Sequence, residues 1–171
     1  VSFSLNGQGV SVDASPGARV SDVLRNNLGM LGTKIGCDAG DCGACTVLID
    51  GKMACSCLTA VAQIEDCSII TVEGLAQNGE MSELQKAFLN YGAAQCGICT
   101  PGMLVAAYAL LMTNPNPSRE DIEEGLSGVL CRCTGYSKII DALMHVSGME
   151  TDYNEAPTIG ESVGAAINRL D

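Results

Sequence analysis

The chain has 171 residues, a length that predicts one or two domains of about 100–200 residues each. It carries 9 Lys and Arg against 20 Asp and Glu, and this formal net charge of −11 argues against a protein that binds nucleic-acid phosphates. Its longest apolar run, 103–112, is well short of the roughly 20 residues that cross a bilayer, and residues 1–6 lack the regions of a secretory signal, so we expect a cytoplasmic protein without a membrane span.

The first part of the chain has the pattern of a small β-rich unit. Residues 1–5 alternate apolar and polar side chains, residues 6–9 predict a turn, and residues 10–13 alternate again, so we expect a β-hairpin. Apolar residues then recur with helical spacing over 20–28 and stop at Gly29. The sequence therefore predicts a hairpin followed by one short helix.

A glycine-rich loop with three cysteines comes next. Ten cysteines in a chain that is 47% hydrophobic favour metal ligands in a reducing compartment over the disulfides of small secreted proteins. The spacing Cys37-x4-Cys42-x2-Cys45, with eleven residues between Cys45 and Cys57, matches the plant-type ferredoxin arrangement that holds a [2Fe-2S] cluster. Interleaved glycines such as Gly40 allow positive φ, which turns backbone N–H groups toward sulfur. Zinc is the less favoured alternative, because zinc sites more often pair two short spacings.

Two strands are predicted after this loop. Residues 46–49 form the first, Asp50-Gly51 a tight turn that leads back toward Cys57, and residues 69–72 the second, which ends near Gly74. Hairpin, helix, strand and strand follow one another in the order of a β-grasp fold, as in ferredoxins. Two cysteines remain outside the ligand set, Cys55 and Cys67. We interpret both as buried free thiols, although Cys55 is close enough to Cys57 that the fourth ligand could be either.

From about residue 77 the apolar period changes to that of helices. A capping box at 82–85 opens a helix that runs to about Tyr91, and residues 118–121 open another. Thr100 is predicted to cap a helix over 100–113, with Pro101 at its first position. A last helix is expected over 137–146. The apolar stripe on the 100–113 helix predicts a bundle core or a partner interface, and its members are Met103, Leu104, Ala107, Leu110 and Leu111.

A second cysteine group lies in this helical part. It consists of Cys96-x2-Cys99 and Cys131-x-Cys133, a pattern that alone would also suit zinc. The start of a helix directly after Cys99 favours an anionic cluster, because the positive end of the helix dipole would lie beside the thiolates. Tyr136 is expected to pack near this group with its hydroxyl hydrogen-bonded.

The two cysteine patterns together resemble the two-cluster iron–sulfur subunit or domain of the molybdenum hydroxylases, a family that includes xanthine dehydrogenase and aldehyde oxidoreductase. The resemblance covers about residues 1–148 and is carried by the first loop with Cys57, by residues 95–102 and by residues 130–136. It implies an α+β fold: a plant-type ferredoxin domain of the β-grasp type over 1–76 and a four-helix [2Fe-2S]-binding domain over 77–150. Residues 151–171 would form an extended tail that contacts or leads to the molybdenum subunit.

The resemblance also implies a function in electron transfer. Electrons would pass from molybdopterin, held by a large partner subunit, through two [2Fe-2S] clusters to FAD on a medium subunit or to another acceptor. The substrate would be a purine, another N-heterocycle or an aldehyde, and no catalytic residue would lie on this chain. Gln95 and Cys133 would contact the molybdopterin. The implied ligands are Cys37, Cys42, Cys45 and Cys57 for the plant-type cluster, and Cys96, Cys99, Cys131 and Cys133 for the cluster near molybdenum.

Two other functions remain open at this stage. A free-standing two-cluster ferredoxin-like carrier would use the same cysteines, although such a shuttle has little use for an apolar helical half and a tail. A zinc-bound interaction module would be colourless, whereas iron–sulfur clusters absorb visible light.

Overall fold

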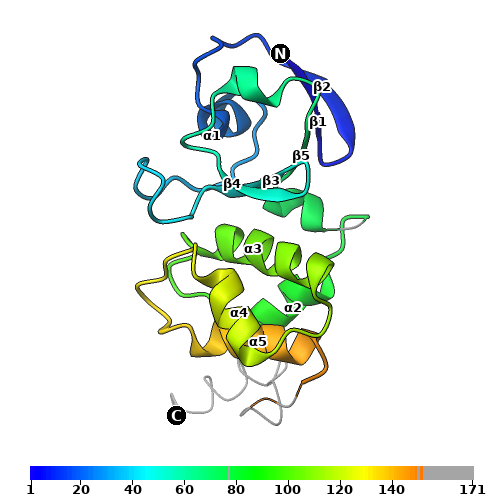
Figure 1. Cartoon of the computed structure of the whole chain (residues 1–171), viewed down its shortest axis with the longest axis vertical. Helices are drawn as coiled ribbons and strands as arrows, with labels where there is room; N and C mark the ends of the chain where they lie inside the picture. Colours follow the sequence, from blue (N-terminus) through cyan, green and yellow to red (C-terminus); the bar gives the residue numbers. More distant parts are fainter. Residues whose placement is uncertain (77, 150, 152–171) are drawn as a thin grey trace, which may run out of the picture.

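The computed structural model describes residues 1–76, 78–149 and 151 of the chain. Its N-terminal half is built on a five-stranded sheet in the order β2-β1-β5-β3-β4, in which β1 and β5 are parallel and all other neighbours antiparallel (Figure 1). The strands are β1 (Ser2–Leu5), β2 (Gln8–Ser11), β3 (Thr46–Ile49), β4 (Lys52–Cys55) and β5 (Ser68–Ile70).

Two tight turns set the register of this sheet. Asn6 and Gly7, both at positive φ, form the whole of the first turn, so β2 begins at Gln8, two residues earlier than predicted. Such turns match the twist of the flanking strands. The predicted turn at Asp50-Gly51 is confirmed and has the same geometry. Because this turn is so short, it also creates β4, a strand that the sequence pattern did not predict.

The helix predicted over 20–28 is present, but its pitch changes along its length. α1 (Val20–Asp22) continues directly into a π-helical turn (Val23–Asn27), in which the Leu28 N–H reaches back to the Val23 carbonyl at 3.1 Å. Two short 3-10 turns, Val61–Ile64 and Val72–Leu75, flank β5. α1, the π-helical turn and the Val61–Ile64 turn close one apolar core, which comprises Phe3, Leu5, Val12, Val20, Val23, Leu24, Val47, Val61, Ile64 and Ile69. Leu75 of the second 3-10 turn lies in the core of the helical half instead.

Four helices make up the C-terminal half of the described chain: α2 (Glu83–Asn90), α3 (Thr100–Thr113), α4 (Arg119–Leu126) and α5 (Ser137–Val146). The predicted capping box at 82–85 is confirmed, and the predicted helix start at 118–121 has one as well. At α2, the Ser82 N–H donates to Gln85 Oε1 at 2.8 Å while the Gln85 N–H donates to Ser82 Oγ at 3.3 Å. At α4, Ser118 and Asp121 exchange the same pair of bonds, which satisfies N–H groups that a helix start leaves free.

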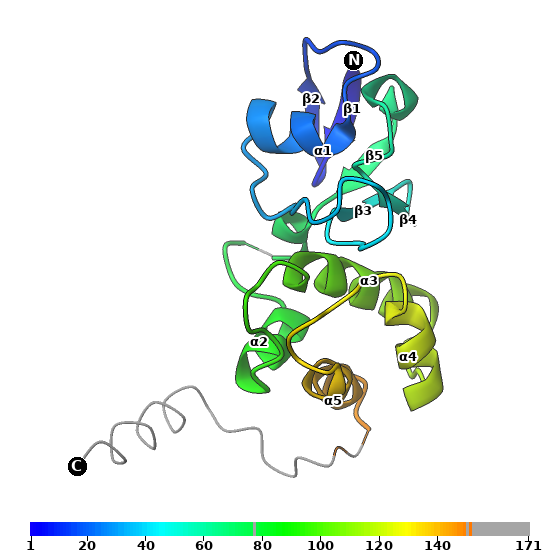
Figure 2. The same cartoon turned by 90° about the vertical axis from the view of Figure 1, so that its left-hand side faces the viewer.

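β3 lies between two apolar cores. Its side chains alternate in direction, so Val47 points into the core beneath α1 while Leu48 points into the core of the helical half, and both are fully buried. Figures 1 and 2 show α3 directly under the sheet, with α2, α4 and α5 on its other side. Residues 102–107 of α3 are accordingly buried without a break, so the predicted one-sided stripe is in fact apolar all round in these turns.

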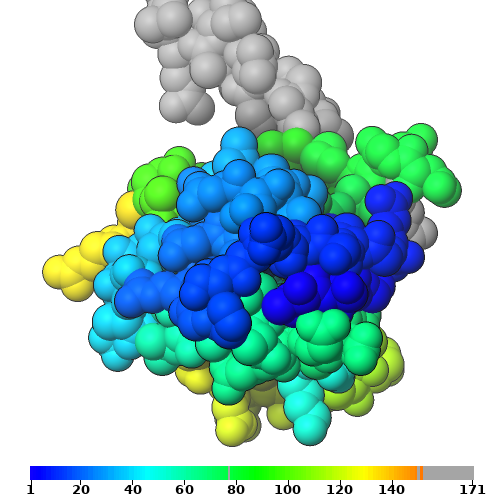
Figure 3. Space-filling model, turned by 90° about the horizontal axis from the view of Figure 1, so that it is seen from above, coloured from blue at the N-terminus to red at the C-terminus, as the bar shows by residue number. Residues whose placement is uncertain are grey.

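None of the helices that the structure describes combines the length and hydrophobicity of a membrane-spanning segment. Seen from above, residues of the N-terminal half cover most of the helical half (Figure 3). The tail predicted over 151–171 lies outside the described residues except for Thr151, whose hydroxyl is 3.4 Å from that of Tyr91.

The two-sided burial of β3 predicts a large cost for truncating Leu48. Leu48→Ala should lower the free energy of unfolding by about 2–5 kcal/mol, because it leaves a cavity between the sheet and α3. Met53→Ala is the control: Met53 faces Leu48 across the β3–β4 pair but is 51% exposed, and its loss should cost no more than about 0.5 kcal/mol. Urea unfolding followed by far-ultraviolet circular dichroism measures both. Equal costs for the two variants would contradict the two-core arrangement.

Candidate metal centres

The structure gathers the first cysteine group around the loop that enters β3. Cys37, Cys42 and Cys45 lie on this loop, and Cys57 follows the end of the neighbouring strand β4. Hydrogen bonds join Cys37 to Cys42 and Cys45 to Cys57. The group therefore has an exposed side at Cys37 and a buried side, where Cys45 is 2% and Cys57 1% exposed.

Backbone N–H groups of the loop point at sulfur, as predicted. The N–H groups of Ala39 and Cys42 donate to Cys37 Sγ at 3.3 and 3.4 Å. Gly40 has the expected positive φ, and Asp38, which is not a glycine, adopts it as well. These hydrogen bonds, the one from Ala39 foremost, lower the pKa of the Cys37 thiol to about 7. The loop thus favours the thiolate, which is the form that binds metal.

Cys55 and Cys57 both lie next to Cys45, but their surroundings differ. Burial, followed by the hydrogen bond with Cys45, raises the pKa of Cys57 to about 11. Cys55 is half-buried at the end of β4, and its thiol donates to the Gly40 carbonyl at 3.6 Å. Burial also raises the pKa of Cys55, and the charges of Cys45 and Cys42 add to this effect. The first group is thus a cage of four predicted ligands with a fifth thiol at its edge.

Arg19 is a neighbour of the first group that the sequence analysis missed. Its guanidinium forms an ion pair with Asp38 on the cysteine loop, and this contact raises the pKa of Arg19. The charge of Cys57 raises it further. No local pattern signals this role, because it depends on the pairing of residues 19–21 with residues 56–60, which follow β4.

The second cysteine group connects the loop before α3 with the segment between α4 and α5. Cys133 Sγ lies 3.6 Å from Cys96 Sγ, and a hydrogen bond joins Cys99 to Cys131. Cys96 and Cys133 are exposed, whereas Cys99 is buried, and burial raises its pKa to about 12. The four predicted ligands therefore come together, again with one exposed and one buried side.

Hydrogen-bond donors also surround the sulfur of the second group. The Thr134 hydroxyl and N–H lie 3.1 and 3.4 Å from Cys131 Sγ. Burial alone would raise the pKa of Cys131, but these bonds and one from the Cys133 backbone lower it. The predicted role of Tyr136 is confirmed: its hydroxyl accepts the Cys131 N–H at 2.9 Å. The role of Thr134, three residues after Cys131, was not predicted.

α3 spans the predicted residues 100–113, but its N-cap lies one residue earlier than predicted. Cys99 is the N-cap and Thr100 already has helical hydrogen bonding, so Thr100 does not cap the helix and Pro101 is at the second position. The Met103 N–H donates to the Cys99 carbonyl at 2.9 Å, which brings the cysteine itself into the first turn. The positive end of the helix dipole therefore begins at the cysteine rather than after it.

Gln95 and Cys133, the two predicted molybdopterin contacts, lie together. The Gln95 side-chain amide donates to the Cys133 carbonyl at 3.1 Å, and both residues are exposed. They come from different segments of the chain, one before α3 and one before α5. The structure brings them together at one edge of the second group.

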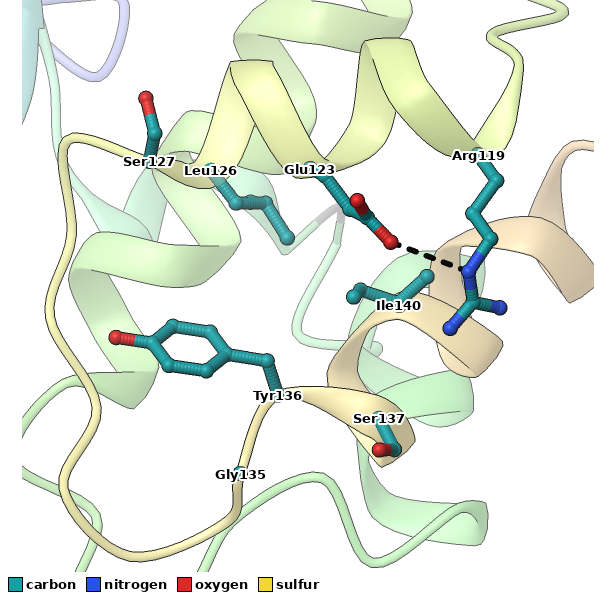
Figure 4. Close-up of a pocket in the computed structure, with 8 residues that line it drawn as sticks. All are labelled: Arg119, Glu123, Leu126, Ser127, Gly135, Tyr136, Ser137 and Ile140. Carbon is teal, nitrogen blue, oxygen red and sulfur yellow. Dashed lines mark hydrogen bonds and ion pairs between the residues drawn. The ribbon is translucent and has the colours of Figure 1, made fainter.

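A cavity of about 420 Å³ lies beside the second group, between α4 and the start of α5 (Figure 4). Tyr136 and Ser137 line one side, and Arg119 lines the other, where its Nε is 3.1 Å from Glu123 Oε1. None of the residues that line it is a cysteine. This cavity is therefore separate from both cysteine groups.

The donor sets fit two-iron clusters. Each group offers four free thiols with hydrogen-bond donors aimed at sulfur, the arrangement that stabilises an anionic cluster. The buried hydroxyl oxygens of Thr33 and Thr100, near the first and second groups in sequence, have no hydrogen-bond partner among the described residues. No three His, Cys, Asp or Glu side chains of the described chain form a group suited to a single ion. A binuclear cluster takes a wider cage.

Comparison with known proteins supports the same interpretation. A family model described as a 2Fe-2S iron-sulfur cluster binding domain matches residues 3–69, and one described as a [2Fe-2S] binding domain matches residues 71–144. The nicotinate dehydrogenase small FeS subunit of Eubacterium barkeri is 46% identical over 145 residues, which is 85% of this chain and 92% of that protein.

Two solved structures have the same fold. Quinoline 2-oxidoreductase from Pseudomonas putida 86 matches with a TM-score of 0.84 and 48% identity, over 86% of this chain and 93% of that chain. Aldehyde oxidoreductase from Desulfovibrio gigas matches with a TM-score of 0.82 and 41% identity, but this chain spans only 16% of its length. With both cysteine groups assembled and both halves matched, the chain belongs to the family of two-cluster iron–sulfur subunits and domains of the molybdenum hydroxylases.

Proposed function

We propose that each cysteine group holds one [2Fe-2S] cluster and that the chain transfers electrons between them. The observation that carries this proposal is the gathering of eight free thiols into two groups, each with hydrogen-bond donors aimed at its sulfur atoms. The proposed ligands are Cys37, Cys42, Cys45 and Cys57 for the first cluster, and Cys96, Cys99, Cys131 and Cys133 for the second.

The finer features of the fold belong to the same proposal. Residues 1–76 would be a plant-type ferredoxin domain of the β-grasp type, supported by the mixed sheet and the helix packed on it. Residues 77–150 would be the four-helix cluster-binding domain, supported by the helical core around α3. Residues 151–171 would run over a molybdenum-binding partner.

Different residues of each group would contribute to holding a cluster in different ways. When bound, each cluster takes up and releases one electron. Backbone N–H groups, such as those of Ala39 and Cys42, stabilise the negative charge of the sulfur atoms, and Thr134 does the same in the second group. Cys57 and Cys99 keep water from the buried side of their groups, and solvent exposure is one of the factors that set a reduction potential.

The exposed edges suggest where electrons enter and leave. Gln95 and Cys133 form an exposed, hydrogen-bonded pair, and we place the molybdopterin of a large partner subunit against them. Cys37 is the exposed cysteine of the first group, so electrons would leave there, toward FAD on a medium subunit or toward another acceptor. The partner subunits would carry the substrate site, and the relatives' names suggest an N-heterocycle or an aldehyde as substrate.

Removing the fourth ligand of the first cluster should halve the iron content. Cys57→Ser should reduce it from about four iron atoms per chain to about two, because the first cluster loses a thiolate on its buried side. Cys55→Ser is the matched control, two residues away on the same segment, and should keep about four. Iron analysis and electron paramagnetic resonance (EPR) of the reduced protein measure both. A Cys55→Ser variant that loses iron while Cys57→Ser retains it would exchange the two assignments.

The proposed order of the clusters predicts that losing the second cluster and losing the first cluster interrupt electron transfer at different steps. In the complete complex, Cys133→Ser should damage the second cluster and slow its reduction by substrate. Cys42→Ser should leave the second cluster reducible by substrate while reduction of the final acceptor stops. Cys67→Ser, which changes a thiol outside both groups, should do neither. Freeze-quench EPR and acceptor assays separate these outcomes, and unchanged acceptor reduction in Cys42→Ser would contradict the proposed order.

A further inference from the structure

The two cysteine groups meet through the backbone. The Leu130 N–H donates to the Cys42 carbonyl at 2.9 Å. Cys42 is a proposed ligand of the first cluster, and Leu130 directly precedes Cys131, a proposed ligand of the second. Figure 2 shows the cyan loop that leads into β3 directly above α3 and the yellow segment after α4 crossing beside it. One hydrogen bond thus connects the two ligand loops.

Glycines make this approach possible. A Cβ on Gly43 would lie 2.1 Å from the Gly128 carbonyl oxygen and 2.9 Å from Val129 Cα. A Cβ on Gly102, three residues after Cys99, would lie 2.4 Å from the Gly43 carbonyl oxygen. These are contacts with backbone, which cannot yield as the end of a flexible side chain can. Gly43, Gly102, Gly128 and the Cys42–Leu130 hydrogen bond are called the glycine seam below.

The Gly43 carbonyl has little freedom to move away from Gly102. It accepts the Thr46 N–H at 3.0 Å and the Thr46 hydroxyl at 2.7 Å, and Thr46 is the first residue of β3. Gly43 itself has a φ of +68°, a conformation that side chains other than glycine rarely adopt. The seam is therefore held from one side by the sheet and from the other by the first turn of α3.

We infer that the glycine seam fixes the separation of the two clusters and thereby the rate of electron transfer between them. Gly43 and Gly102 are positioning residues in this sense. The step moves one electron from the reduced second cluster to the oxidised first cluster, with no bond made or broken and no proton transferred. Such transfer weakens steeply with distance, so a shift of the seam by the width of one methyl group is enough to slow it. The inference rests on the proposed function, since it needs both clusters in place.

Gly102→Ala is the sharpest test. Alanine suits a helix better than glycine does, and Gly102 has no positive φ, so the variant adds a steric clash at the seam and no backbone strain. Gly128→Ala is the matched control: it lies in the seam, but its Cβ would meet nothing within 4 Å among the described residues. Ile122→Ala removes a fully buried side chain from the helical core and controls for lost stability alone.

Pulse radiolysis that delivers less than one electron per chain reports the transfer rate, and EPR of the fully reduced protein reports the magnetic interaction between the clusters. We expect Gly102→Ala to slow the transfer severalfold and to weaken that interaction, while Gly128→Ala and Ile122→Ala keep both. Wild-type values in a Gly102→Ala protein with a full iron content would overturn the inference and leave the proposed function intact. An iron content below that of two clusters in the wild-type chain would contradict the proposed function instead.

A second pair of variants covers a Gly102→Ala protein that does not fold. Leu130→Pro removes the N–H that bonds to Cys42, and Leu130→Ala keeps it; the Leu130 side chain is 56% exposed, so its loss alone should change little. Slower transfer in Leu130→Pro than in Leu130→Ala supports the inference. Equal rates in the two loaded variants would overturn it.

Discussion

The negative charge of the cysteine sulfur atoms is the constraint on which the arrangement of both loops depends. The chain already carries a formal charge of −11, and every thiolate that binds metal adds to it. The loops place hydrogen-bond donors and a helix start near the sulfur atoms: N–H groups at Cys37, the Thr134 hydroxyl at Cys131 and the start of α3 at Cys99. These donors belong to the backbone or to side chains close to the cysteines in sequence. The positive φ of Asp38 and Gly40 is a local consequence of this arrangement.

The sheet gives the two loops a common support. β3 begins directly after the first cysteine loop, and its Leu48 packs in the same core as α3, which begins at the second group. A displacement of either loop is therefore resisted by the same buried layer. In this respect the apolar helical half, which a free-standing carrier would not need, serves to hold one sulfur cage at a fixed position relative to the other.

Local signals in the sequence were enough to find most of the site. Cysteine spacing located both groups, and the capping boxes at Ser82 and Ser118 located two helices, because these features depend on residues a few positions apart. Contacts between distant segments were not predictable in this way. The pairing that creates β4, the approach of Arg19 to the first loop and the bond from Leu130 to Cys42 all depend on tertiary packing. The prediction that Thr100 is the N-cap of α3 was wrong, because Cys99 is the N-cap.

The strand shared by both cores has a consequence for how this unit can be inherited. Splitting the chain near residue 76 would expose Leu48 on one piece and the first turns of α3 on the other, so each piece would have a solvent-exposed apolar surface. Gene rearrangement can therefore move the pair of halves as a block far more easily than either half alone. The match covers 93% of the chain from quinoline 2-oxidoreductase but only 16% of the aldehyde oxidoreductase chain. In both proteins the two halves occur together, as expected of a unit whose halves share a core.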